Sequence, residues 1–442
     1  MRRWLTLLLL AAALLAGRPA SAQQAGGHPV WAASLEAGLA GAKAKGQALM
    51  VALNMDRERG NQQMVDEVYT SAEFHEAAKL SVIAVASLFQ HPSKRDAGGA
   101  MVCARFGSVT CAQHRAIEKI VRQDWLGRGP KDEIESPRHI FVSPAGKILF
   151  QRVWTMDAPA LAALMKRASE LCTPDRLAKW DTIDGRFERA ADPIATVREI
   201  ALTELVAAND PAIDERLVKL AKTTTTAPAV AGAIYAAFVG AATPERRKFG
   251  QAGLGDRLPE VRLSVAHALE KLEPEEVVPA LLAQAAREKD DRARGEMYRA
   301  IGTLGVRPKK DPRVEKLLLK AISTSGDGAR GHAAVAIAPW AAETAVKTEL
   351  RKIVIQGDSQ DTRSAAIWAL GYCEDKSLVE EFGKLHDGLT LRDWKVRMAL
   401  ESAQAKLSGR DPPGYDDAPR RFLPHPAEGE PPPDIPKDWG KK

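Results

Sequence analysis

Residues 260–272 read EVRLSVAHALEKL, and this stretch decides the fold of the larger part of the chain. Its apolar side chains recur with the spacing i, i+4, i+7, i+8 and i+11, at Val261, Val265, Ala268, Leu269 and Leu272. This spacing places one apolar stripe along an α-helix. The sequence therefore predicts an amphipathic helix that must pack against a neighbouring helix.

Segments of this kind repeat along residues 190–408. Six of them carry an arginine near their start, at Arg198, Arg262, Arg294, Arg330, Arg363 and Arg397, in steps of 64, 32, 36, 33 and 34 residues. A further helical segment around Val230 lies at the midpoint of the first step. With second amphipathic helices between them, these segments predict about seven units that stack into an all-α solenoid. We expect the recurring arginine to be structural, through bonds to the aspartate or the carbonyl groups of the adjacent turn.

The repeat resembles HEAT-type helical pairs of the short bacterial kind. The resemblance rests on the motif V-R-x-x-A-x-x-A-L, seen as Val261-Arg262 with Ala268-Leu269 and as Val396-Arg397 with Ala399-Leu400. A solenoid of this type implies a long curved surface for a protein partner. The arginine-bearing helices carry both signs of charge, which suits a protein better than a nucleic acid, at Arg262, Glu270, Lys271, Glu296, Arg299, Lys395 and Glu401.

Residues 28–175 carry alternating strand and helix signals instead. Short apolar runs predict buried strands at 48–53 and 80–88, and two further strands at 139–143 and 148–153 are joined by a Pro-Ala-Gly-Lys turn. Helices are predicted over 35–45, 61–78 and 157–171, with Ser71 as an internal break or cap and Asp157 as an N-cap. The sequence therefore predicts an α/β domain ahead of the helical repeats.

This order of elements resembles the thioredoxin-like fold, specifically its exported or lipoprotein-type members. The resemblance rests on Trp31 before a helix containing AKAKGQ, on ALMVALNMD at 48–56, and on SPRHIFVSPAGKILFQRVWT at 136–155. It implies a cis peptide bond before Pro137 and a groove near Pro137 that holds an extended peptide. The redox members carry C-x-x-C directly after the first buried strand, but residues 54–61 contain no cysteine. Ordinary thioredoxin chemistry at that place is excluded, because it needs two sulfurs about one helical turn apart.

The cluster CARFGSVTCAQH at 103–114 brings Cys103, Cys111 and His114 close together in the sequence. Four interpretations remain open: a structural disulfide, a copper or zinc site, a displaced redox pair in which His114 aids thiolate formation, and two buried thiols. The metal site would be completed by His91, His139 or His75. A continuous helix would hold the two cysteines about 12 Å apart. The bridge and the metal site therefore both require the chain to turn, and we expect that turn at Phe106-Gly107-Ser108.

The remaining cysteines and histidines fit packing roles. Cys172 and Cys373 are expected to be small buried apolar residues. His267 and His332 lie on repeat helices without a carboxylate partner at ligand spacing. The sequence contains no nucleophile elbow, P-loop, zinc-protease motif or dinucleotide-binding glycine fingerprint, so it indicates no enzyme class.

The two ends of the chain carry processing and tail signals. Residues 1–22 predict a signal peptide, with basic Arg2 and Arg3, a short apolar core and Ala20-Ser21-Ala22 before cleavage at Gln23. The mature chain is then expected to be periplasmic or secreted, without a membrane span. Removal of the signal peptide would leave 60 basic residues against 57 acidic ones. This balance is too even to suggest a nucleic-acid partner. Residues 409–442 contain nine prolines and predict a disordered tail.

These observations favour an exported protein-binding or scaffold protein over an enzyme. A degenerate thioredoxin-like module would be joined to a HEAT-repeat interaction surface, with no cofactor. The alternative is a thiol oxidoreductase or a metal-handling protein that acts through Cys103, Cys111 and His114 with a copper or zinc ion.

Overall fold

The computed structural model describes residues 28–56, 59–89, 101–132, 134–223, 226–324, 327–357, 359–390 and 393–410. The expected signal peptide and residues 411–442 of the expected tail lie outside these ranges. The chain divides into two compact units, Met1–Thr182 and Ile183–Lys442; the first is α/β and the second is helical. No helix in the described part of the chain is long and apolar enough to cross a membrane.

The first unit is built on a four-stranded sheet with the strand order β2-β1-β3-β4. Strand β1 (Ala48–Leu53) pairs in parallel with β2 (Ser81–Ala86), whereas β3 (Arg138–Val142) runs antiparallel to both β1 and β4 (Ile148–Val153). All six residues of β1 are buried, as expected for a central strand covered on both faces. The strands lie where the apolar runs of the sequence predicted them.

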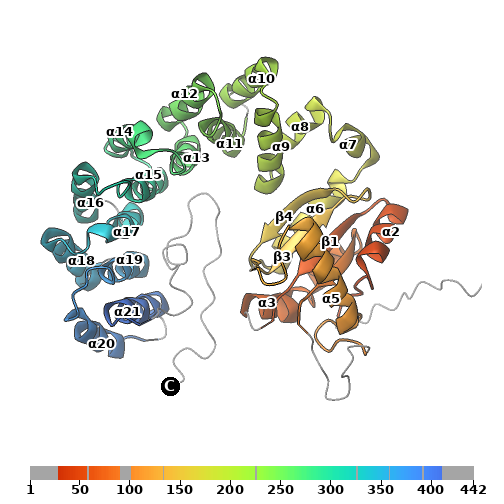
Figure 1. The fold of residues 1–442 in the computed structure, drawn as a ribbon, viewed down its shortest axis with the longest axis horizontal. Coiled ribbons are helices and arrows are strands. Elements are labelled where there is room, and N and C mark those ends of the chain that lie inside the picture. The colour runs from red at the N-terminus through yellow and green to blue at the C-terminus, as the bar shows by residue number, and fades with distance from the viewer. Residues whose placement is uncertain are drawn as a thin grey trace, which may run out of the picture. The chain divides into compact units, whose positions relative to one another are not determined.

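Helices cover both faces of this sheet (Figure 1). On one face, α2 (Leu35–Lys45) and α5 (Cys111–Ile120) share a buried apolar cluster with the strands. On the other, α6 (Ala158–Leu171) contacts β1, β2 and β3 and packs against α4 (Ala72–Ala77). The shorter elements of the unit are α3 (Arg59–Gln63), the π-helical turns η1 (Met64–Val68) and η2 (Val121–Trp125), and α7 (Pro174–Lys179) near its end.

Side-chain caps fix where these helices begin. The Ser71 hydroxyl accepts a hydrogen bond from the Phe74 amide at 3.1 Å and starts α4, which confirms the break expected within residues 61–78. The Asp157 carboxylate accepts from the Ala160 amide at 2.8 Å and starts α6, as predicted. The Ser136–Pro137 peptide bond is cis, as the resemblance implied.

The second unit is a row of consecutive packed helices. In chain order these are α8 (Ile183–Ala190), α9 (Ala195–Ala207), α10 (Pro211–Lys222), α11 (Pro228–Val239), α12 (Pro244–Ala252), the 3₁₀ turn η3 (Gly253–Gly255), α13 (Pro259–Leu269), α14 (Pro274–Ala285), α15 (Asp291–Leu304), α16 (Pro312–Thr324), α17 (Asp327–Ala336), the 3₁₀ turn η4 (Ala338–Trp340), α18 (Thr344–Gln356), α19 (Gln360–Leu370), α20 (Leu378–Asp387) and α21 (Trp394–Leu407). Each of the seven repeat segments expected from the sequence is a helix. Six helices in the described part of this unit begin with a proline, whose missing amide costs nothing in the first helical turn: α10, α11, α12, α13, α14 and α16.

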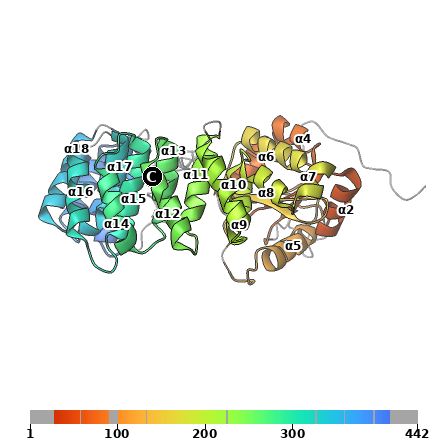
Figure 2. The same cartoon turned by 90° about the horizontal axis from the view of Figure 1, so that it is seen from above.

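The helices of this unit form two layers. The odd-numbered helices from α9 to α21 each pack against the next odd-numbered helix and line the inner side of the row, while the even-numbered helices lie outside (Figure 1). Figure 2 shows the same helices side by side from a second direction. One apolar cluster runs from Ala190 to Leu407. Gly250 permits a close approach within this packing, because a Cβ there would lie 2.5 Å from the Val239 nitrogen.

The recurring arginine has the structural role expected of it. In five of the six repeats its guanidinium donates to a main-chain carbonyl six to nine residues earlier. The acceptor lies in the connection before the arginine's own helix or, for Arg330 and Arg363, in the last turn of the helix before that connection. All five arginines have a main-chain acceptor, and Arg294 in addition donates to the carboxylate of Asp291. The bonds are Arg198 to Asp192 (2.7 Å), Arg262 to Asp256 (2.8 Å), Arg294 to Glu288 (3.1 Å), Arg330 to Ile322 (2.9 Å) and Arg363 to Val354 (3.1 Å).

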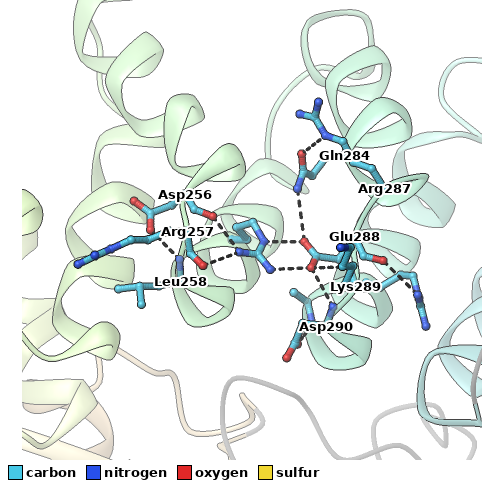
Figure 3. Close-up of polar contacts among 11 residues, drawn as sticks. Asp256, Arg257, Leu258, Gln284, Arg287, Glu288, Lys289 and Asp290 are labelled. Carbon is cyan, nitrogen blue, oxygen red and sulfur yellow. Dashed lines mark hydrogen bonds and ion pairs between the residues drawn. The ribbon is translucent and has the colours of Figure 1, made fainter.

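Arg262 also forms a buried ion pair with the next unit. Its Nε and Nη2 donate to the two carboxylate oxygens of Glu288, each at 2.6 Å. Glu288 in addition accepts from the main-chain amides of Lys289 and Asp290, at 2.9 and 3.0 Å (Figure 3). Arg262 therefore serves the packing of the row, in line with the structural role predicted for the recurring arginine.

Further ion pairs link equivalent positions of successive units. Arg246 donates to Asp214 at 2.6 Å and Arg216 donates to Asp184 at 2.9 Å, and both pairs span 32 residues. This separation matches the repeat step read from the sequence. The helical packing therefore follows the sequence period.

Candidate functional site

The chain turns between Cys103 and Cys111, as both the bridge and the metal site require. The Gly107 amide donates to the Cys103 carbonyl at 2.8 Å, and the Cys103 amide donates to the Val109 carbonyl at 2.7 Å. Gly107 has a φ of 75°, in the left-handed region that favours glycine. A Cβ at this position would also lie 2.4 Å from the His28 Cβ. The expected turn is therefore present, and it depends on a glycine.

Helix α5 begins immediately after this turn and carries the other two residues of the cluster. The Thr110 hydroxyl accepts from the Gln113 amide, and the Gln113 side chain accepts from the Thr110 amide at 2.8 Å. This reciprocal capping box fixes the first helical turn. Cys111 is the first residue of that turn, and His114 lies three positions later on the same face.

His114 is oriented by the end of strand β2. Its Nδ1 lies 2.9 Å from the carbonyl oxygen of Ser87, the residue that follows β2, so Nδ1 is the nitrogen that donates. The Phe106 ring packs edge-on against the imidazole, with 5.2 Å between ring centres. The cluster therefore sits beyond the carboxyl end of β2, an edge of parallel strands at which α/β proteins commonly bind ligands.

Cys103, Cys111 and His114 converge in space. One ligand atom from each, a sulfur or a ring nitrogen, lies within 4.8 Å of the others. The three residues are 1%, 2% and 0% exposed. The cysteines are present as thiols, with no disulfide between them. Burial raises the pKa of the Cys103 thiol to about 11, so this thiol is protonated at neutral pH and is a poor nucleophile.

The other histidines considered for this cluster lie elsewhere or outside the described residues. The Nε2 atom of His139 lies 2.9 Å from the Tyr69 hydroxyl, and burial lowers the pKa of His139 to about 3. His75 lies beside Phe74, with 6.3 Å between ring centres. Neither belongs to the group of converging ligand atoms found in the described part of the chain. His91 lies outside that part.

Two buried asparagines, Asn54 and Asn61, flank the segment that follows strand β1. The Asn54 side-chain amide donates to the Asn61 carbonyl at 3.1 Å, and the Asn61 side-chain amide donates to the Ser136 hydroxyl at 3.0 Å. Pro137 follows directly. Arg105, from the cysteine loop, donates to the Asn54 side-chain oxygen at 2.9 Å. This polar network ties the cysteine loop to the segment before Pro137, and no pattern in the sequence predicted it.

The helical unit holds a second group of potential ligands that the sequence analysis missed. His267 Nδ1 lies 2.9 Å from a carboxylate oxygen of Glu296, which corrects the expectation that His267 has no carboxylate partner. Glu270 lies close to both. Glu296 is fully buried, so it is not a surface charge as the sequence suggested, and its hydrogen bond raises the pKa of His267. Arg299 lies 3.6 Å from the second oxygen of Glu296 and competes with any cation there.

The remaining cysteines and His332 have the packing roles that their positions suggested. Cys172 and Cys373 are 3% and 6% exposed. His332 is also buried, and its ring lies against Gly295, where a Cβ would come within 2.5 Å of His332 Cδ2. We therefore assign none of the three to the candidate site.

No protein-family model matches this sequence, and no curated protein is significantly similar to it.

Proposed function

We propose that this chain is an exported protein-binding or scaffold protein, in which a thioredoxin-like module without its dithiol precedes HEAT-type repeats. The observation that best supports this function is the unbroken row of helices from α9 to α21 over one continuous apolar core. Such a row presents an extended surface, and solenoids use surfaces of this kind to bind other macromolecules.

The side chains at the end of the row favour a protein as the bound macromolecule. The Lys406 ammonium lies 4.5 Å from the ring centre of Trp368 and 3.9 Å from that of Tyr372. Tyr372 is 44% exposed. Exposed aromatic side chains beside a cation are typical of the residues that contribute most to protein–protein binding.

The α/β unit supports the module assignment through its order of elements. A parallel β1–β2 pair is followed by the β3–β4 hairpin and a closing helix, which is the order on which the resemblance rested. The network from Asn54 to Ser136 replaces a dithiol with side chains that have no redox chemistry. A binding role near Pro137 fits this replacement better than thiol exchange does.

Cross-linking in the native host tests this function. The tagged full chain would be treated with a lysine-reactive cross-linker, captured, and analysed by mass spectrometry. We expect partner peptides to be joined to Lys271, Lys395 or Lys406, on the helix row. Replacement of Tyr372 by alanine should lower the yield of the partner severalfold.

Leu80→Ala is the matched control, because Leu80 is also an exposed apolar residue, 41% exposed, but belongs to the first unit. We expect this variant to retain the partner. A chain recovered alone, or a partner lost with Leu80→Ala and kept with Tyr372→Ala, would contradict a binding surface on the row.

A second candidate function is metal handling at Cys103, Cys111 and His114, and the convergence of their ligand atoms favours it. Thiol oxidoreductase activity fits the same residues less well, because reactive cysteines need solvent access and a lowered pKa. An insulin-reduction assay should therefore show no turnover. Turnover that disappears in Cys103→Ser would restore the redox alternative.

A further inference from the structure

We propose that Cys103, Cys111 and His114 bind one copper(I) ion, through the two sulfurs and Nε2 of the imidazole. The proposal deepens the metal-handling candidate and rests on it, but it is independent of the protein-binding function, because metal content and partner capture are measured separately. It rests on the spacing of the three ligand atoms, on the orientation of the imidazole, and on the number and softness of the ligands.

The spacing is close to what a three-coordinate ion needs. Bonds of about 2.3 Å to sulfur and 2.0 Å to nitrogen, at angles near 120°, would place the ligand atoms roughly 3.7 to 4.0 Å apart. The ligand atoms of this cluster already lie within 4.8 Å of one another. Side-chain rotations that close each separation by about 1 Å or less would complete the site.

The imidazole is oriented as metal-binding imidazoles usually are. Nδ1 donates to the Ser87 carbonyl at 2.9 Å, which assigns the proton to Nδ1 and the lone pair to Nε2. Histidine ligands of metals commonly donate their other ring nitrogen to a carbonyl or carboxylate in this way, which fixes the tautomer and the ring direction. Ser87 is thus the positioning residue of the site.

The backbone that carries the sulfurs is also held in place. The turn at Gly107 and the capping box at Thr110 determine where Cys103 and Cys111 lie relative to each other. A site held on such elements needs little rearrangement to bind an ion.

The ligand set selects the ion. Thiolate sulfur is a soft ligand and favours copper(I) and zinc among the common metals. A closed zinc site takes four protein ligands, and an open one takes three and a water. The described residues bring three ligand atoms together here, and all three residues are buried away from solvent, which favours an ion that needs no fourth ligand. Copper(I) accepts three-coordination. On binding, each thiol loses its proton to the solvent and forms a copper–sulfur bond, so one copper(I) ion replaces two protons without any change in oxidation state.

Competition with a chromophoric chelator provides the test. The reduced full chain would be titrated without oxygen into the copper(I)–bicinchoninate complex, and the loss of colour would be recorded. We expect one copper(I) ion to be removed per chain. Cys103→Ser, Cys111→Ser and His114→Gln should each weaken binding at least about 100-fold, because each removes a ligand.

The double variant Cys172→Ser/Cys373→Ser is the matched control, because both cysteines are buried but lie outside the cluster. It should bind copper(I) as the parent does. X-ray absorption of the copper-loaded parent requires no variant to fold, and it should show two sulfur ligands and one nitrogen ligand. A parent that removes no copper(I), a Cys111→Ser variant that binds equally well, or zinc that displaces copper(I) at equal concentration would overturn the proposal.

Discussion

The ion pair between Arg262 and Glu288 allows a quantitative test of how the helix row is stabilised. Arg262→Met keeps the length of the side chain but removes both charged hydrogen bonds to Glu288 and the bonds to the carbonyls of Asp256 and Arg257. The side chains of Arg262 and Glu288 are 12% and 1% exposed, so the variant leaves a carboxylate buried without its cation.

Loss of one partner of a buried ion pair costs about 3 to 5 kcal/mol. Glu288 keeps hydrogen bonds from the amides of Lys289 and Asp290, so we expect the lower end, about 3 kcal/mol. In a helical unit of this size that loss lowers the melting temperature by roughly 6 to 12 °C. Thermal unfolding followed by circular dichroism at the helical band measures the shift.

Two variants separate this ion pair from a general effect of charge. Arg257→Met removes an exposed arginine one turn earlier, and we expect it to cost less than about 0.5 kcal/mol. The double variant Arg262→Met/Glu288→Met removes both charges and should regain most of the stability. The reasoning would be refuted if Arg262→Met had the same melting temperature as Arg257→Met. It would also be refuted if the losses of unfolding free energy in Arg262→Met and Glu288→Met simply added in the double variant.

Four further outcomes follow from other positions. Leu269→Asp places a charge in the core of the row, where Leu269 is 1% exposed, and should cost more than about 4 kcal/mol in thermal unfolding. Gly107→Ala should weaken copper(I) binding at least about 10-fold, because the turn between the cysteines needs a positive φ at this residue. Gly146→Ala is the control: Gly146 also has a positive φ, but a Cβ there meets no other atom, and copper(I) binding should be unchanged. The pKa of His139 is near 6.5 in the unfolded chain but about 3 in the folded one, so the first unit should lose stability as the pH falls between these values. His139→Gln should flatten this pH dependence, which thermal unfolding at pH 4 to 8 measures. N-terminal sequencing of the chain from its host should begin within a few residues of Gln23, and a retained Met1 would contradict export.

The sequence predicted those features that depend on local spacing. The seven repeat helices were predicted because their apolar stripes and arginines recur at a fixed step, and the arginine bonds were predicted because each closes within nine residues. The turn at Gly107 was predicted because the distance between the cysteines demanded it. Each of these features depends on residues that lie close together in the sequence.

Features that depend on distant partners could not be predicted in this way. Glu296 lies 29 residues after His267, and it becomes a neighbour only because successive units stack. A search for polar pairs about one helical turn short of a repeat step would have found it. The orientation of His114 depends on Ser87, 27 residues earlier, so the sequence could not decide among the alternatives for the cysteine cluster.

The side-chain bonds described in the helix row join residues of one unit or of two neighbouring units, and this limits what must be preserved when the number of units changes. Arg198 and its counterparts bind a carbonyl six to nine residues earlier, within their own unit. The pairs Arg216–Asp184 and Arg246–Asp214 span 32 residues, and each joins one unit at the start of the row to the next one. Because neither kind of bond extends past an immediate neighbour, duplication or deletion of one of these units in the gene would recreate the same kinds of bond at the junction. A solenoid built in this way can evolve a longer or shorter surface in single steps without redesign of its remaining contacts.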